Sequence, residues 1–258
     1  MIENDPTDDV RLLGEWLTEA GLDLLVLKPH AGEPLPADLD GYAALVVLGG
    51  DQHAYPGPDG QPGAPWFPEL QSLLRKAVRA NVPTLGVCLG AQLLAVAQNG
   101  TVAPSAAGPE IGAHLVAKRD AADRDPLFAP LPMLPDVIQW HHDEVSELPL
   151  GAVLLATSTN YANQAFRVGE SAWGVQFHPE ADTAMIAEWA ATNELVLAEL
   201  GTTAEEVVEA VDALSDDLFE VWQPVAARFA AVARGELSRG KPELPGPAIG
   251  RELPLLGR

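Results

Sequence analysis

The stretch that most constrains the fold of this 258-residue chain is residues 83–95, where a short apolar run leads through a glycine-flanked cysteine into a helical pattern. The apolar run has the character of a buried strand, and the residues after it, 89–98, recur with helical spacing. Cys88 would lie at the bend, with Gly86 and Gly90 two residues away on either side. A strand, a sharp turn and a helix in this order are typical of an α/β fold.

Cys88 has the sequence setting of an activated nucleophile. Small neighbours in the pattern Gly-x-Cys-x-Gly let the backbone take a strained turn that lifts the reactive atom clear of the sheet. The helix that follows would direct its positive dipole end at the sulfur, which favours thiolate over thiol. A lone cysteine in an apolar run is otherwise a small buried hydrophobe. The nucleophile interpretation therefore requires a histidine that can take the thiol proton.

A suitable histidine follows the alternating apolar run 173–177, in the sequence His-Pro-Glu at 178–180. Residues two apart on an extended chain point to the same side, so His178 and Glu180 can face each other. A cysteine nucleophile needs a base to take its proton, and the base needs a third group to hold its tautomer. We therefore expect Cys88, His178 and Glu180 to act together.

These residues carry a family resemblance. The segment Gly-Val-Cys-Leu-Gly-Ala-Gln at 86–92, together with His-Pro-Glu at 178–180, resembles the class I (triad-type) glutamine amidotransferase domain. The nearest members are stand-alone proteins similar to the amidase half of GMP synthetase, and the resemblance covers about residues 4–200. It implies hydrolysis of the γ-carboxamide of glutamine or of a γ-glutamyl compound through a γ-glutamyl thioester. It implies no metal and no cofactor.

The resemblance also implies an oxyanion hole and a set of substrate-binding residues. The backbone amides of Gly50 and Leu89 would hold the oxyanion, although a glycine turn chosen only for its dihedral angles is the alternative for Gly50. Gln92 matches the family's glutamine-contacting position, with a helix-surface glutamine as the alternative. In the Trp-His-x-Asp segment, Asp143 is a plausible acceptor for the substrate's α-ammonium group, and His141 would either hold the loop or touch the substrate.

Some positions depart from the family pattern. Many relatives carry proline where this chain has Asp51, and glycine where it has His142. His53 follows in a loop expected to overhang the pocket. These departures favour, weakly, a substrate other than plain glutamine. Glu110 is read as a solvated turn residue rather than a site residue.

Composition excludes several classes of function. A formal net charge of −22 argues strongly against nucleic acid as a partner. No apolar run approaches the length of a membrane span, and the N-terminus lacks a basic-then-apolar signal. The single cysteine rules out an internal disulfide. We therefore expect a cytoplasmic protein with a small-molecule substrate, and no nucleic-acid or membrane partner.

The pattern of apolar runs and helical stretches predicts an α/β fold. We expect a doubly wound, mostly parallel sheet of the flavodoxin-like, three-layer kind, with an antiparallel strand extension. The first strand is either very short or incomplete at residues 1–2. Residues 1–200 would form the amidotransferase-like domain. The expected strands are 24–27, 43–48, 113–117, 153–157, 164–168 and 172–177.

A helical appendage is expected at 201–234, followed by a Pro/Gly-rich tail at 235–258. Thr203 opens a capping box, and an apolar stripe then continues for over seven turns through Pro224, which is expected to kink the helix. We expect the stripe to pack on the domain rather than to bind a partner. The tail is expected to be flexible or to wrap the surface.

The chain has too few residues after position 200 for an ATP-using acceptor domain, so any acceptor chemistry would belong to a separate ATP-dependent synthetase subunit. Three functions therefore stay open. The protein supplies ammonia to such a partner, or it releases an amine as a γ-glutamyl peptidase acting alone. Alternatively, it is a non-catalytic binding or regulatory module that retains the fold.

Overall fold

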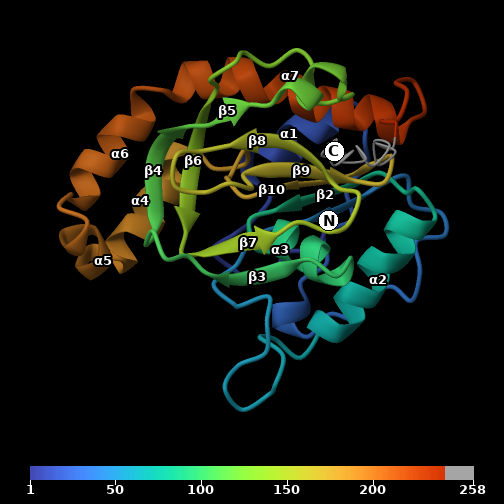
Figure 1. The fold of residues 1–258 in the computed structure, drawn as a ribbon, viewed down its shortest axis with the longest axis horizontal. Helices are drawn as coiled ribbons and strands as arrows, with labels where there is room; N and C mark the ends of the chain where they lie inside the picture. Colours follow the sequence, from blue (N-terminus) through green and yellow to red (C-terminus); the bar gives the residue numbers. More distant parts are fainter. Residues whose placement is uncertain (242–258) are drawn as a thin grey trace, which may run out of the picture.

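The structure is a computed structural model that describes residues 1–241, and its centre is a six-stranded sheet in the order β1-β2-β10-β9-β8-β5 (Figure 1). β1, β2 and β10 are parallel, while β9, β8 and β5 continue the sheet in antiparallel pairings. The predicted α/β class is confirmed. The sheet strands are β1 (Leu45–Val47), β2 (Thr84–Val87), β10 (Ala172–Val175), β9 (Ala165–Val168), β8 (Val153–Thr157) and β5 (Ala117–Lys118).

The parallel part of the sheet continues past β1 only as isolated bridges. Ile2 bridges in parallel to Val47 on one side and to Leu27 on the other. The predicted strand at 24–27 is therefore reduced to a single bridging residue. The predicted strand at 113–117 is also wrong as one unit, because residues on either side of Val116 pair with different sheets.

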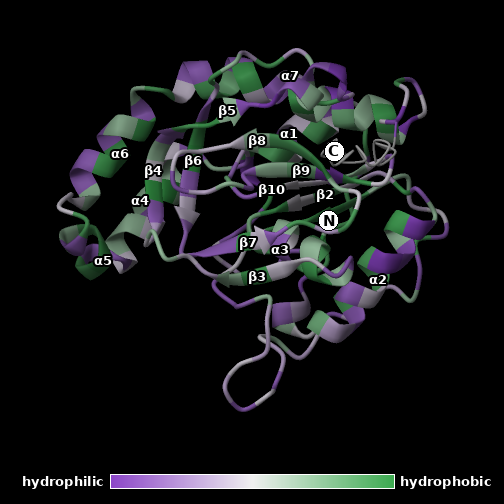
Figure 2. Cartoon of the chain, in the orientation of Figure 1, coloured by the Kyte–Doolittle hydropathy of each residue, from purple (hydrophilic) through white to green (hydrophobic). Residues whose placement is uncertain are grey.

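Helices cover both faces of the sheet, so the three-layer arrangement is confirmed. Because side chains alternate along a strand, Val46 and Leu85 pack toward α1, α4 and α7, whereas Leu45 and Val47 pack toward α2 and α3. Figure 2 shows the amphipathic character of α2, with hydrophobic and hydrophilic sides. These helices are α1 (Arg11–Glu19), α2 (Phe67–Arg79), α3 (Leu89–Ala97), α4 (Thr183–Thr192) and α7 (Ser215–Ala233).

Two antiparallel ribbons stand beside the main sheet. β3 pairs with β7, and β4 pairs with β6. The Trp-His-x-Asp segment spans the end of β6 and the start of β7. The ribbon strands are β3 (Thr101–Pro104), β4 (Glu110–Leu115), β6 (Asp136–His141) and β7 (Asp143–Glu147), and the short helical turns are η1 (Pro29–Ala31) and η2 (Asp120–Arg124).

The C-terminal helices pack on the same core as the sheet. The capping box at Thr203 is present and opens α6 (Ala204–Asp212). The long stripe is not one helix, however, because the chain turns between α6 and α7 so that α6 can pack on α4 and β4 while α7 packs on α1 and β6. Pro224 lies inside α7, and the helix continues to its end. A short helix, α5 (Glu194–Glu199), precedes them.

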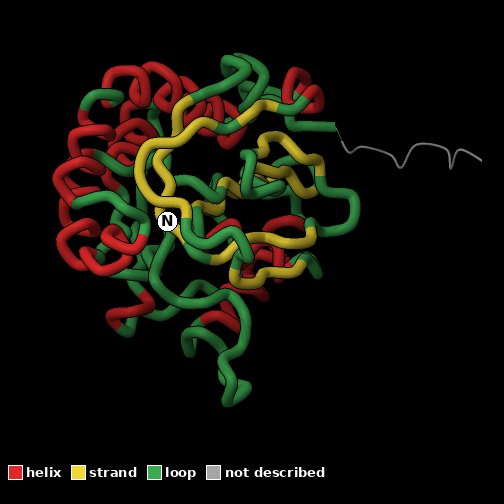
Figure 3. The backbone as a smooth tube through the Cα atoms, turned by 60° about the vertical axis from the view of Figure 1, so that its left-hand side comes forward, coloured by secondary structure: helices red, strands yellow, loops and turns green. Residues whose placement is uncertain are grey.

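The remaining segments are loops. Residues 51–65 form a loop between β1 and α2 that projects from the body of the molecule, as Figure 3 shows at the bottom of the view. The first part of the predicted tail is held against the domain, because the Gly240 amide donates to Glu170 O at 2.8 Å. Residues 242–258 of the tail lie outside the described residues. Within residues 1–241, no helix is both long enough and apolar enough to cross a membrane.

Candidate active site

Cys88 lies at a strained bend between β2 and α3. Its φ of 48° falls in the left-handed region, which is unusual for a residue other than glycine. The flanking glycines are required by close backbone contacts. A Cβ on Gly86 would lie 2.5 Å from Gly90 O, and a Cβ on Gly90 would collide with Val47 O. The predicted elbow is therefore present, and its backbone contacts leave room only for glycine at positions 86 and 90.

His178 follows β10 and is fixed by two interactions. Its backbone amide donates to Ile138 O at 2.8 Å, and its ring Nδ1 lies 2.7 Å from Glu180 Oε1. Both side chains are buried. The ring's other nitrogen, Nε2, has no hydrogen-bond partner within the described residues. Glu180 thus holds the imidazole by one nitrogen and leaves the other available.

The imidazole of His178 shares a cavity of about 230 Å³ with Cys88. Burial alone would lower the pKa of His178, but the negative charges of Cys88 and Glu180 outweigh it and raise that pKa well above its usual range. The arrangement therefore favours the protonated form of His178. Its Nε2 is the nitrogen that can take a proton from the Cys88 sulfur.

Asp8, which the sequence reasoning missed, lies beside this pair. Its Oδ1 is 3.8 Å from His178 Nδ1 and has no hydrogen-bond partner within residues 1–241. Burial raises the pKa of Asp8 to about 7, against the opposing charge of His178. Gly49 makes room for this contact, since a Cβ there would lie 2.8 Å from Asp8 Oδ1. No pattern in the sequence links Asp8 to a histidine so far along the chain.

Asp8, His178 and Glu180 also offer one possible metal-ligating atom each, and these atoms lie within 4.8 Å of one another. The 2.7 Å separation of Nδ1 and Oε1 is a hydrogen-bond distance that already accounts for the imidazole's orientation. We interpret the cluster as the hydrogen-bonded pair of His178 and Glu180, with the Asp8 carboxyl beside it.

The backbone amides expected to form the oxyanion hole lie on adjacent turns. Gly50 has a φ of 152°, and a Cβ on it would lie 3.1 Å from Leu89 Cδ2. Leu89 is the first residue of α3, so its amide has no acceptor within the helix. Neither amide donates a hydrogen bond to another group within the part of the chain that the structure describes.

Gln92 is buried and lies in a network of amides. Its Nε2 donates to Asp143 O at 3.3 Å and to Gln176 Oε1 at 3.2 Å. Gln176 Nε2 in turn donates to Cys88 Sγ at 3.5 Å. Sequence reasoning missed Gln176, which directly follows β10 and lies two residues before His178.

His141 is bonded at both ring nitrogens. Nδ1 lies 3.1 Å from Asp143 O, and Nε2 lies 2.9 Å from Gln139 Oε1. Burial lowers the pKa of His141, although Glu110 opposes that shift. The interpretation of Glu110 as a solvated turn residue is wrong. Its side chain is buried and accepts from Gln164 Nε2 at 2.6 Å, because β4 brings it against β6.

Asp143 is engaged by the loop after β1. His53 Nδ1 lies 2.9 Å from Asp143 Oδ2, and the Tyr55 hydroxyl donates to Oδ1 at 3.2 Å. The rings of His53 and Tyr55 stack with centroids 5.0 Å apart. The predicted overhang of His53 is therefore present, and Asp143 is the residue that anchors it.

Two cavities open beside Cys88. The first, of about 150 Å³, is lined by Gln92, His141, Asp143 and the loop residue His53. The second is the 230 Å³ cavity that contains His178. The sequence-predicted residues thus converge on Cys88 from two sides. His142 and Asp51 line the first cavity as well, and Asp51 also reaches the second.

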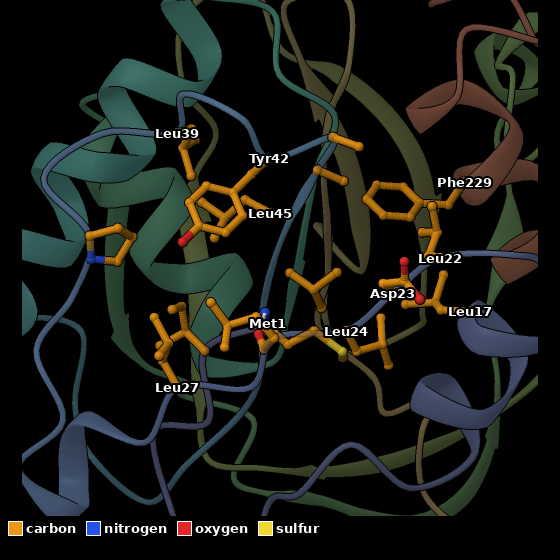
Figure 4. A pocket seen from close by; sticks show the side chains of 16 residues that line it. Met1, Leu17, Leu22, Asp23, Leu24, Leu27, Leu39, Tyr42, Leu45 and Phe229 are labelled. Carbon is orange, nitrogen blue, oxygen red and sulfur yellow. Dashed lines mark hydrogen bonds between the residues drawn. The ribbon is translucent and has the colours of Figure 1, made fainter.

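A further cavity lies apart from these residues. Figure 4 shows side chains including Leu17, Leu24, Tyr42 and Phe229 around it, and its lining is mainly aliphatic. It contains neither Cys88 nor His178.

Comparison with known proteins places this geometry in a family. The family model "Glutamine amidotransferase class-I" matches residues 17–188. γ-Glutamyl peptidase 4 of Arabidopsis thaliana is 32% identical over 57% of this chain and 57% of its own length. A glutamine amidotransferase-like protein of Salmonella typhimurium is 32% identical over 64% of this chain and 68% of its own.

Solved structures agree with this placement. A glutamine amidotransferase from Thermotoga maritima superposes with a TM-score of 0.78 at 27% identity, covering 89% of this chain and 96% of its own. One from Methylobacillus flagellatus gives a TM-score of 0.79 at 27% identity, with coverage of 95% and 96%. The fold, the elbow and the sequence similarity agree, and the chain belongs to the class I glutamine amidotransferase family.

Proposed function

We propose that this chain hydrolyses the γ-carboxamide of glutamine or of a γ-glutamyl compound, with Cys88 as the nucleophile. The observation that carries the proposal is that His178 lines one cavity with Cys88 while Glu180 holds its Nδ1, and that its Nε2 has no hydrogen-bond partner within residues 1–241. The γ-glutamyl peptidase and hydrolase relatives support this class of reaction.

The chemistry proceeds in two stages. Cys88 transfers its proton to His178 and attacks the carboxamide carbon, and the amides of Gly50 and Leu89 stabilise the oxyanion that forms. His178 then gives the proton to the leaving nitrogen as the C–N bond breaks, leaving a γ-glutamyl thioester. Water, deprotonated by His178, attacks the thioester and releases glutamate.

The first cavity fits the glutamyl part of the substrate. Asp143 would receive the α-ammonium group, with Gln92 and His141 keeping the wall in place through their hydrogen bonds to its backbone. Because His53 and Tyr55 already hold the Asp143 carboxylate, substrate binding would use the remaining acceptor capacity of its oxygens.

The partner is a separate question. GMP synthase of Christiangramia forsetii is 35% identical over only 26% of its own length, so a similar amidase in this chain could supply ammonia to a separate ATP-dependent synthetase subunit. A non-catalytic module is the alternative from another class.

Glutamate release from glutamine and from γ-glutamyl amides tests the proposal, with Cys88→Ala as the comparison. We expect release by the wild type and loss of it in the variant. Release from glutamine that rises when a synthetase is added would favour the ammonia-supply role. No release from any of these substrates, with or without a synthetase, would establish the binding module instead.

A further inference from the structure

The second cavity has a chemical role that follows from His178. The general acid must reach the leaving nitrogen in order to protonate it. His178 lines only the larger cavity, whereas Gln92, His141 and Asp143 line only the smaller one. If Cys88 attacks at the junction, the glutamyl part lies in the smaller cavity and the leaving group lies in the larger. We call the larger cavity, which contains His178, the leaving-group chamber.

The leaving-group chamber is larger than ammonia needs. Its volume is about 230 Å³, and a cavity needs only about 10–15 Å³ on a comparable measure to hold a water-sized molecule. The chamber therefore has room for an amine with several carbon atoms.

Carboxyl groups outnumber basic groups in the lining of the leaving-group chamber. Asp8, Asp51 and Glu188 contribute carboxyls, and among the described residues His178 is the one basic side chain that lines it. Arg11, the basic residue beside it, is already paired with Asp9 at 2.7 Å and with Glu188 at 3.2 Å. The imidazole of His178 is likewise paired with Glu180.

The charge of Asp8 is only partly compensated inside the protein, by His178 Nδ1 at 3.8 Å. The Asp8 side chain is only 7% exposed, and its Oδ1 has no hydrogen-bond partner in the described chain. The pKa values of Asp8 and Asp51 are both raised, in each case by burial and then by neighbouring charges that include the Asp5 carboxylate. A cation in the chamber would relieve this crowding of carboxyls.

The aromatic wall of the chamber suits the same ligand. Trp140 and Trp189 line it with ring centroids 5.5 Å apart, and Trp189 Nε1 is occupied by Thr7 O at 2.9 Å. Indole faces bind alkyl chains and attract ammonium groups.

We propose that the leaving-group chamber selects an aliphatic amine that carries a second positive charge, so that the preferred substrate is the γ-glutamyl amide of a diamine. This inference rests on the proposed hydrolysis and adds its substrate class. Water and the amide yield glutamate and the free diamine, with His178 supplying the proton to the nitrogen that leaves. A γ-glutamyl amino acid fits poorly, because its carboxylate would face Asp8 and Asp51.

A matched series of substrates tests the inference. We use the γ-glutamyl amides of 1,4-diaminobutane, n-butylamine and 4-aminobutyrate, which differ only in the end group of a four-carbon chain. We expect kcat/KM to fall about tenfold from the cationic to the neutral amide, and further for the anionic one. Asp51→Asn and Asp8→Asn should each reduce the ratio of cationic to neutral kcat/KM at least threefold, whereas Glu209→Gln on the exposed side of α6 should not change it.

Binding to Cys88→Ala, measured by calorimetry, separates the two proposals. If no amide is hydrolysed but the cationic amide binds best, the chamber is correct and the proposed hydrolysis is wrong. If all three amides are hydrolysed or bound without this order of charge, or if Asp51→Asn and Asp8→Asn leave the ratio unchanged, the inference about the diamine is overturned while the hydrolysis stands.

Discussion

The two cavities beside Cys88 differ in how their polar groups are satisfied. In the smaller one, Gln92, His141 and Asp143 all form hydrogen bonds with other parts of the protein, although Gln52 Oε1 has no partner among the described residues. In the leaving-group chamber, Asp8 Oδ1 and His178 Nε2 are both buried without a hydrogen-bond partner within residues 1–241. Buried groups without partners cost free energy, so a fold keeps them where a reaction or a ligand uses them. The difference indicates a preformed wall on one side of the sulfur and the reacting groups on the other.

The largest effect should come from removing the imidazole. His178→Ala should lower kcat for glutamate release by at least about 10⁴-fold with little change in KM, because proton transfer is lost while the smaller cavity is intact. Steady-state kinetics with a γ-glutamyl amide measures this. His114→Ala, on β4 and outside both cavities, is the control. A decrease in kcat of less than tenfold would show that His178 does not transfer the proton.

The burial of the Asp8 carboxyl should make the free energy of unfolding depend on pH. The pKa of Asp8 is raised from 3.8 to about 7, so the folded state retains a proton that the unfolded state loses between these pH values. Stability then falls as pH rises through this window, and Asp8→Asn should remove a cost of up to about 4 kcal/mol at pH 8. Urea unfolding at pH 4 and pH 8 measures the difference. The gain should vanish near pH 4, and Asp59→Asn in the exposed loop should show no gain at either pH. A variant that is less stable at pH 8 would contradict the assignment.

Substitution of Asp143 in the smaller cavity should weaken substrate binding rather than slow the chemical step. Asp143→Ala should raise KM by about 10- to 100-fold and change kcat only a few-fold, because it removes the proposed ammonium acceptor and the anchor of His53. Asp143→Asn keeps the shape and should show a smaller rise. A fall in kcat at constant KM would mean that the wall takes part in the chemistry, which would erase the difference between the cavities.

The smallest effect concerns the alkaline side of the pH profile. Ionised Asp8 lies 3.8 Å from His178 Nδ1 and favours the imidazolium, so Asp8→Asn should let His178 lose its proton at lower pH. The alkaline limb of kcat/KM should move to lower pH, with about a two- to tenfold loss of activity there. Profiles of kcat/KM for the wild type and Asp8→Asn between pH 6 and 10 test this. If the alkaline limb does not move, Asp8 does not affect the proton of His178, and its role is confined to the lining of the leaving-group chamber.

Local sequence signals anticipated the elements that carry the chemistry. The elbow at Cys88 and the strand that delivers His178 follow from glycine spacing and apolar alternation, which are properties of neighbouring residues. The long stripe after Thr203 shows the limit of such signals. Its periodicity is helical throughout, yet the chain turns after α6, so that α6 packs on α4 and β4 while α7 packs on α1 and β6.

The sequence by itself determined the strand-turn-helix at Cys88, the pairing of His178 with Glu180 and the α/β class, because each depends on residues within a few positions of one another. Only the tertiary structure decided that Asp8 lies behind the imidazole, that His53 and Tyr55 hold Asp143, and that Glu110 is buried beneath His141. These contacts join segments far apart in the chain. The burial of these side chains, and the charges that surround them, depend on how distant segments pack, and a local sequence pattern does not predict that packing.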